Sequence, residues 1–168
     1  MSKVNTLQDF LVEQLRDLYS AETQILQNLP KMAQQASHSD LRQAFEAHVK
    51  ETEGHVERLT RIASILNFKP EGHTCEAMKG IVREAKEWIA ENAPDDVRDA
   101  GLISNAQRVE HYEIAGYGTA RAIAEKLGHV DVVNLLEQTL QEEKTTDQRL
   151  TRLAVGTINE DAARNRGN

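Results

Sequence analysis

Hydrophobic residues recur at helical spacing along most of this chain. From Thr6 to about Ser37, apolar side chains return at intervals of about three to four residues, the period of one face of an α-helix. The same period runs through residues 39–67, 93–128 and 130–158, and a shorter apolar run covers residues 74–92. The pattern predicts four long amphipathic helices, with one short helix between the second and the third.

Local signals support the expected helix ends. Thr6 can cap the first helix, and Asp9 follows at the position that completes a capping box. Pro30 should kink or interrupt this helix, because proline removes a backbone hydrogen bond. Gly128 suits the C-terminal cap of the third long helix, where a left-handed residue is common. The breaks in the hydrophobic pattern therefore coincide with residues that begin or end helices.

The order of the elements predicts the fold class. Two long helices, a connector that holds a short helix, and two more long helices are typical of an all-α, ferritin-like four-helix bundle with one crossover. We expect residues 1–158 to form this bundle and residues 159–168 to be a frayed tail. A length of 168 residues is ample for one such domain and requires no second one.

A short segment of the second helix returns in the fourth. Residues 58–62 read Arg-Leu-Thr-Arg-Ile and residues 149–153 read Arg-Leu-Thr-Arg-Leu, at an offset of 149 − 58 = 91. The same offset relates Glu22 in the first helix to Glu113 in the third, since 113 − 22 = 91. The repeat predicts two pseudo-twofold halves.

Composition and charge exclude several classes of function. The net charge of −7 is unsuited to unaided nucleic-acid binding, which requires clustered basic residues. The single cysteine, Cys75, cannot form a disulfide framework or a four-cysteine metal site within one chain. No apolar run approaches the ~20 residues of a membrane span, and residues 1–5 lack an apolar signal core. We therefore expect a cytoplasmic protein that binds neither a membrane nor nucleic acid.

Acidic residues interrupt the apolar stripes near the middle of the long helices. Glu22, for example, lies between Leu18 and Ile25, where the helical period requires an apolar residue. Helix midpoints share one level in an up-and-down bundle, so these acids should converge. Buried carboxylates are costly unless cations or protons neutralise them, and the pattern therefore predicts a metal site. The expected metal ligands are Glu22, Glu51, His55, Glu110, Glu113 and Glu143.

The second helix leaves its ligands open. Thr52 takes the centre of its stripe, while Glu51 lies toward one edge, beside His48 and His55. The fourth helix likewise offers several neighbouring acids. Further candidates, either as ligands or as hydrogen-bond partners of ligands, are His48, Glu142, Asp147 and Tyr117.

The donor types indicate which metals to expect. Oxygen ligands with one or two histidines suit iron or manganese, whereas zinc usually prefers more nitrogen or sulfur. Glu110 and Glu113 are one helical turn apart and can reach one cluster from a single helix. This spacing favours two ions bridged by carboxylates, and the donor types make them iron or manganese.

Three segments carry a family resemblance. Residues 17–22 read Asp-Leu-Tyr-Ser-Ala-Glu, residues 109–115 read Val-Glu-His-Tyr-Glu-Ile-Ala and precede Tyr117, and residues 142–144 read Glu-Glu-Lys. Over nearly the whole chain the sequence resembles the YciE/YciF family of bacterial ferritin-like stress proteins. The resemblance implies a five-helix bundle, a homodimer and a rubrerythrin-type di-iron centre, but no established reaction.

Rubrerythrin-like sites place a Glu on the first and third helices, a Glu-x-x-His on the second and fourth, and an added Glu on the third. If Glu51 begins the motif on the second helix, position 54 is glycine and His55 comes one residue late. The fourth helix offers Glu142 or Glu143, with no histidine at the corresponding place. This departure bears on oxygen-activating chemistry more than on metal binding. The positions that match the pattern are Glu22, Glu110 and Glu113.

Three hypotheses for function follow. The leading one is a non-haem di-iron, or di-manganese, protein of the stress response that reduces peroxide or oxygen. Its electrons would come from a donor protein or a small reductant, because the chain has no rubredoxin-like cysteine cluster. The second is iron binding or storage without turnover. The third is a metal-free structural or interaction dimer, whose inner acids would pair with Arg16, Arg108 or Lys144.

Overall fold

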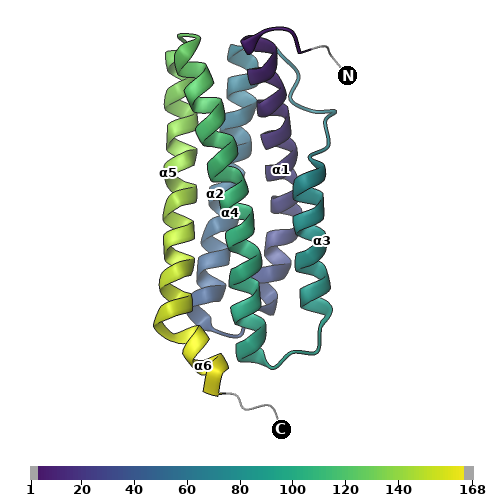
Figure 1. The fold of residues 1–168 in the computed structure, drawn as a ribbon, viewed down its shortest axis with the longest axis vertical. Helices are drawn as coiled ribbons and strands as arrows, with labels where there is room; N and C mark the ends of the chain where they lie inside the picture. The colour runs from purple at the N-terminus through teal and green to yellow at the C-terminus, as the bar shows by residue number, and fades with distance from the viewer. Residues whose placement is uncertain (1–3, 165–168) are drawn as a thin grey trace.

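The structure, a computed structural model, describes residues 4–164, which form an upright bundle of helices (Figure 1). The all-α, ferritin-like architecture expected from the sequence is confirmed. The elements are α1 (Leu7–Gln35), α2 (Ser39–Ile65), α3 (Glu76–Ala90), α4 (Asp95–Lys126), α5 (Val130–Leu153), a π-helical turn (Ala154–Ile158) and α6 (Asn159–Arg164).

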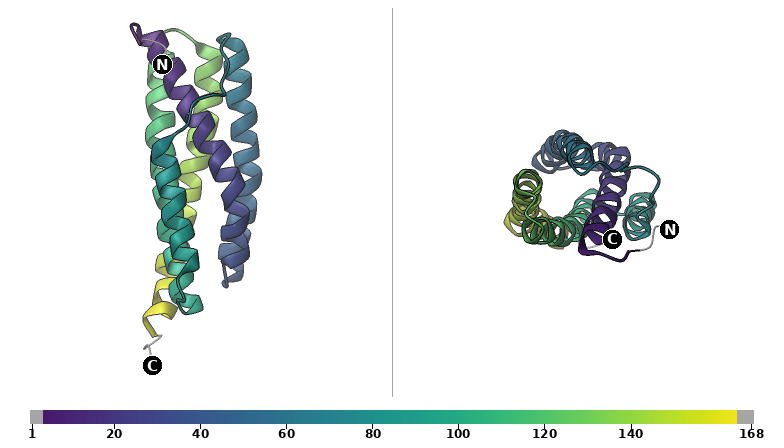
Figure 2. Two further views of the ribbon diagram at one scale, coloured as in Figure 1. Left: turned by 90° about the vertical axis from the view of Figure 1, so that its right-hand side faces the viewer. Right: turned by 90° about the horizontal axis from the view of Figure 1, so that it is seen from above.

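The four long helices form the sides of the bundle, and the short helix lies outside it. α1 packs against α2 and α4, and α5 packs against the same two helices from the opposite corner. α2 and α4 run in the same direction, so the chain between them crosses the length of the bundle (Figure 1). The view from above in Figure 2 shows α3, which belongs to this crossover, against the outside of α1 and α4.

The helix ends follow the local signals for the most part. The Thr6 hydroxyl accepts from the Asp9 backbone N–H at 3.0 Å, and the Asp9 carboxylate accepts from the Thr6 N–H at 3.0 Å, which completes the capping box. Gly128 follows α4 with a φ of 78° and confirms the predicted C-terminal cap. The interruption considered at Pro30 is absent, because α1 continues through it to Gln35.

The C-terminal segment is more ordered than its sequence indicated. Residues 159–164, expected to be frayed, form α6, which packs against α4. The π-helical turn changes the direction of the chain between α5 and α6, and Ile158 is buried within it. The rest of the expected tail, residues 165–168, lies outside the described residues.

The core consists of two apolar clusters with a polar layer between them. One cluster contains Leu11, Leu15 and Leu18 of α1, together with buried residues of α2, α4 and α5. The other begins with Ala21 and Ile25 and continues toward the opposite end of the bundle. Buried polar side chains of α1, α2, α4 and α5 lie at the level where the two clusters meet. The two apolar clusters therefore enclose a layer of buried polar and charged side chains between them.

α3 approaches α4 closely because residue 101 has no side chain. A Cβ atom at Gly101 would lie 2.0 Å from the Trp88 ring, and the Trp88 indole N–H donates to the Arg98 carbonyl at 3.1 Å. This contact seats α3 on the bundle.

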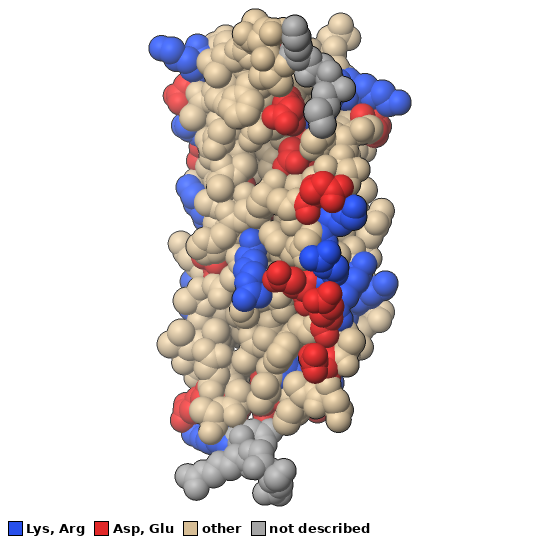
Figure 3. All heavy atoms as spheres, turned by 45° about the vertical axis from the view of Figure 1, so that its right-hand side comes forward, with Lys and Arg blue, Asp and Glu red and all other residues tan. Residues whose placement is uncertain are grey.

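The surface carries both signs of charge. On the face drawn in Figure 3, basic and acidic side chains of the described residues lie among one another, without an extended basic field. Within the described part of the chain, none of the helices combines the length and the apolar character needed to cross a membrane.

Candidate metal centre

Four helices contribute side chains to the buried polar layer. Each side chain projects from the inner face of its helix, and the residues are at most 3% exposed. Most of the acids expected to converge at one depth therefore do so, and His48 joins them, whereas Glu51 stays at the edge of the layer. The members are Glu22 from α1, His48 and His55 from α2, Glu110 and Glu113 from α4, and Glu143 from α5.

Their donor atoms fall into two groups. One donor atom from each of His48, Glu110, Glu113 and Glu143 lies within 4.8 Å of the others, and so do donors from Glu22, His55 and Glu143. Because Glu143 belongs to both groups, its carboxylate lies between two possible ion positions. This is the arrangement that a carboxylate-bridged pair of metal ions requires.

His55 is oriented from outside by a carboxylate. Its Nε2 lies 2.9 Å from Glu142, and Arg58 holds that carboxylate through two hydrogen bonds of 2.7 and 2.8 Å. The opposite ring nitrogen, Nδ1, then faces inward, 3.2 Å from Glu22 and 2.9 Å from Glu143. A carboxylate behind a histidine is the usual support of a metal-binding imidazole, because it fixes the ring and its tautomer.

His48 has a similar support with the ring reversed. Its Nδ1 lies 3.3 Å from Glu51, and the Thr146 hydroxyl donates to the same Glu51 oxygen at 3.3 Å. Its Nε2 faces inward, 3.2 Å from Glu110. Both histidines of α2 therefore direct one nitrogen to the centre and the other to an outer glutamate.

Many inward-facing atoms have no hydrogen-bond partner among the described residues. Although His55 Nδ1 lies close to two carboxylates, neither contact has hydrogen-bond geometry. Both oxygens of Glu113 and both of Glu143 are also unpartnered. Buried polar atoms normally have hydrogen-bond partners. A cluster of carboxylate oxygens and imidazole nitrogens without such partners therefore fits a bound cation. The remaining members of this set are Glu22 Oε2, His48 Nε2 and Glu110 Oε2.

The charges of the cluster do not balance on their own. Burial raises the pKa of Glu113 well above its usual value, and the neighbouring carboxylates raise it further. Burial likewise raises the pKa of Glu143 to about 8. With both imidazoles protonated, four carboxylates still exceed two positive charges, so the metal-free cluster must retain protons. Divalent cations would displace these protons and remove the repulsion.

The pKa values of the two histidines reflect the same excess of carboxylates over imidazoles. Burial lowers the pKa of His55, but its contacts with Glu143 and Glu22 outweigh burial and raise it to about 10. Burial also lowers the pKa of His48, and the charge of Glu110 raises it well above the usual range.

Tyr117 completes the inner layer as a hydrogen-bond donor. It is fully buried, its hydroxyl donates to Glu22 Oε1, and its ring lies edge-on to His55 with 6.4 Å between the ring centroids. Burial raises the pKa of this phenol, and the charge of Glu22 adds to the effect. Tyr117 therefore keeps its proton and holds the Glu22 carboxylate in place.

Four of the sequence candidates lie outside both donor groups, namely Tyr117 and three acids. The Glu51 side chain is 42% exposed and the Glu142 side chain 35%, and each contacts the outer nitrogen of a histidine. Asp147 instead accepts from the Gln107 side chain at 2.9 Å and lies 3.3 Å from His111.

As the apolar stripe of α2 predicts, Thr52 lies at its centre, so a Glu-x-x-His motif begun at Glu51 is one residue out of register. The inward positions are Thr52 and His55, both fully buried, so Thr52 occupies the place of glutamate in the Glu-x-x-His pattern. Its hydroxyl donates to the His48 carbonyl at 2.9 Å and thus stays with its own helix. On α5 the corresponding pair is Glu143 and Thr146, with threonine in the place of histidine.

The internal repeat could have indicated this register. The offset of 91 relates Thr52 to Glu143, since 143 − 52 = 91, and it relates His55 to Thr146, since 146 − 55 = 91. It also relates Glu51 to Glu142, the two outer supports. Equivalent positions in the two halves thus face the same way, although α2 supplies both nitrogen donors.

Ion pairing does not replace a metal in the way the metal-free hypothesis requires. Arg16 donates to the Lys69 carbonyl at 2.9 Å and covers the Phe68 ring, while Arg108 donates to Asn105 at 3.0 Å. Among the described residues, no ion pair links Arg16, Arg108 or Lys144 to an acid of the inner layer.

Comparisons with known proteins agree with this architecture. Residues 6–163 match the family described as Domain of unknown function (DUF892). The sequence is 45% identical to protein YciF of Escherichia coli over 160 residues, which cover 95% of this chain and 96% of YciF.

Solved structures extend the similarity. The crystal structure of the E. coli stress protein YciF superposes with a TM-score of 0.89 at 44% identity, over 93% of this chain and 99% of that one. YcfI of Rhodopseudomonas palustris, for which a structural role has been suggested, gives 0.86 at 45% identity, over 89% and 96%. A protein from Xanthomonas campestris shares the fold at 20% identity, with a TM-score of 0.76 over 96% and 100%.

Proposed function

Because this chain belongs to the DUF892 family and is a homologue of the stress protein YciF, we propose that it is a non-haem di-iron, or di-manganese, protein that reduces peroxide or oxygen. One observation carries the proposal. Two groups of buried, unpartnered donor atoms share the carboxylate of Glu143 in the middle of the bundle.

The donor set suits these metals. It combines four carboxylates with two imidazoles, and cysteine does not take part. Hard oxygen donors with a minority of nitrogen favour iron or manganese over zinc. Glu22, His55 and Glu143 would hold one ion, and His48, Glu110, Glu113 and Glu143 the other.

The protein side chains position the centre and control its protons. When bound, the metal pair supplies the two electrons that reduction of a peroxide O–O bond requires. Glu142 and Glu51 orient the two histidines, and Tyr117 donates a hydrogen bond to Glu22. The apolar clusters above and below close the polar layer toward the two ends of the bundle.

We extend the proposal to two partners. The single Cys75 is buried and contacts Asp17 and Tyr112, so it does not offer a surface redox pair. Electrons would therefore reach the centre from a separate donor protein or a small reductant. We also propose a homodimer, which light scattering coupled to size exclusion would test.

Metal loading and turnover provide the test. Anaerobic titration with ferrous iron should end at about two ions per chain, as expected of a two-metal site. The loaded protein should then consume peroxide faster than Glu113→Ala, while Glu53→Ala, an exposed change on α2, should match the parent chain. If iron loads stoichiometrically but the parent chain and both variants consume peroxide at equal rates, the remaining function is iron binding without turnover.

A further inference from the structure

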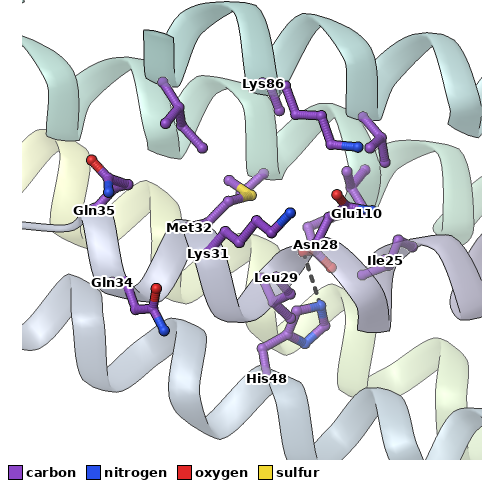
Figure 4. Close-up of a pocket in the computed structure, with 15 residues that line it drawn as sticks. Ile25, Asn28, Leu29, Lys31, Met32, Gln34, Gln35, His48, Lys86 and Glu110 are labelled. Carbon is purple, nitrogen blue, oxygen red and sulfur yellow. Dashed lines mark ion pairs between the residues drawn. The ribbon is translucent and has the colours of Figure 1, made fainter.

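A deep pocket leads from the surface to the candidate metal centre. It has a volume of about 360 Å³ and lies between α1, α3 and α4 (Figure 4). His48 and Glu110 line its inner end and form the ion pair drawn there. The volume falls within the ~300–1,000 Å³ range of small-molecule sites. An organic molecule could therefore reach two members of the donor set directly.

The pocket is elongated and its walls are aliphatic. On α1 the lining residues extend from Ile25 to Gln35, ten positions, or about 15 Å at the rise of an α-helix. α3 forms the opposite wall. The aliphatic and thioether side chains that make these two walls are Ile25, Leu29, Met32, Val82, Ala85 and Ile89.

Two exposed lysines add positive charge to the pocket. Lys31 and Lys86 reach over it from α1 and α3 (Figure 4). Neither forms an ion pair or a hydrogen bond with another described residue, although the protein has a net charge of −7. Two unpaired ammonium groups beside an aliphatic cavity favour a ligand with an anionic head and an apolar chain.

Resting on the proposed function, we infer that the substrate is a medium-chain fatty-acid hydroperoxide. Its carboxylate binds Lys31 and Lys86, its chain lies along the aliphatic walls, and its hydroperoxide group reaches His48 and Glu110. Hydrogen peroxide has no apolar part to fill these walls, whereas burial of each methylene of a fatty-acid chain favours binding. The pocket therefore selects the organic peroxide.

The reaction balances with the electrons of the proposed centre. The O–O bond of the hydroperoxide breaks as it accepts two electrons and two protons, which gives the hydroxy fatty acid and one water molecule. Two ferrous ions held by the donor groups would each supply one electron and become ferric, and water would supply the protons.

Binding can be tested without any metal. Laurate titrated into the metal-free protein should bind, as measured by calorimetry, and Lys31→Ala/Lys86→Ala should weaken it about ten-fold. Uncharged dodecanol should lose far less affinity in this variant. Val82→Phe should weaken both ligands, because it fills the aliphatic wall. The matched control, Lys50→Ala/Lys126→Ala, removes two exposed charges elsewhere and should bind laurate as the parent chain does.

Turnover separates this inference from the proposed function. In ferrous-loaded protein, the ratio of the rate with a fatty-acid hydroperoxide to the rate with hydrogen peroxide should fall about ten-fold in Lys31→Ala/Lys86→Ala, again the effect of lost binding contacts. Hydrogen peroxide reduction without laurate binding, and with an unchanged ratio, would overturn the substrate and retain the function. Laurate binding without reduction of either peroxide would overturn the function and this substrate with it. If either pocket variant alters the oligomeric state but leaves laurate affinity unchanged, the pocket is a contact between copies of the chain. That result also overturns the inference.

Discussion

Glu113→Gln should make the metal-free protein more stable and the metal-loaded protein less stable than the parent chain. Glu113 is fully buried, and neither of its oxygens has a hydrogen-bond partner among the described residues. Burial first, and then the charges of Glu143, Glu22 and Glu110, raise its pKa. A glutamine of the same shape removes this conflict and can donate its amide hydrogens to the neighbouring carboxylates.

The size of the effect follows from the unsatisfied carboxyl. An unpartnered buried polar group costs about 1–3 kcal/mol, so we expect a gain of ~2 kcal/mol without metal. For a domain of this length, that gain raises Tm by about 4–8 °C. Metal at about 1,000 times its Kd should in turn stabilise the parent chain by ~4.1 kcal/mol, most of which the variant forfeits. The order of the two proteins therefore inverts when metal is added.

Thermal unfolding followed by circular dichroism at pH 7 provides the assay, once with a chelator and once with excess manganous ion, which resists air oxidation. Glu53→Gln, an exposed substitution on α2, serves as the neutral control. A metal-free Glu113→Gln protein that melts below the parent chain would refute the reasoning, because it would mean that the Glu113 carboxyl stabilises the fold without a cation.

Three further predictions concern the same layer and its surroundings. The pKa values of His55, about 10, and Glu143, about 8, are raised, so the folded metal-free protein retains protons that the unfolded chain releases. Its free energy of unfolding should therefore fall between pH 6.5 and 8, by up to ~1.4 kcal/mol per pH unit for each group. A free energy from denaturant unfolding that does not change over this pH range would contradict the prediction. Glu142→Gln should weaken ferrous binding about 10–100-fold in a competitive titration, since it supports His55 from outside, and an effect as complete as that of Glu113→Ala would instead make it a ligand. Gly101→Ala should cost about 1–3 kcal/mol in urea unfolding, because the new Cβ would overlap the Trp88 ring, and unchanged stability would show that α3 adjusts freely.

The helices and their order could be predicted from the sequence, because each long helix repeats its apolar residues over many turns. The capping box at Thr6 and the left-handed Gly128 have local causes that residue identity reveals. The depth of the acids was also predictable, since Glu22 and Glu113 interrupt otherwise apolar stripes. The helical period and the position of each acid along its helix therefore predicted the depth of the candidate metal centre.

The ligand set on α2 could not be settled in the same way. Thr52 is a polar residue that can face the core by bonding to its own helix, so its central position gave no indication of a metal. Glu51 has the more typical ligand side chain but projects from the edge of the stripe to hold His48. Which of two adjacent residues faces inward depends on the rotation of the whole helix, and packing sets that rotation.

Long-range contacts were also beyond sequence reasoning. Asp99 of α4 is 2% exposed and accepts from the backbone N–H groups of Ser37 and His38 at 2.9 and 2.7 Å, which caps the turn between α1 and α2. The π-helical turn before α6 has no marker in the sequence either. Both depend on chain segments that meet only in the folded state.

Both imidazole donors of the centre are carried by α2. His48 and His55 are seven residues apart, about 10.5 Å along the helix axis, yet their rings converge to a centroid separation of 6.3 Å. A slide or rotation of α2 would withdraw both nitrogen donors from the proposed ion positions at once, while the carboxylates of the other three helices stayed in place. We therefore expect loading and release of the proposed pair of ions to be cooperative, because both depend on the position of α2.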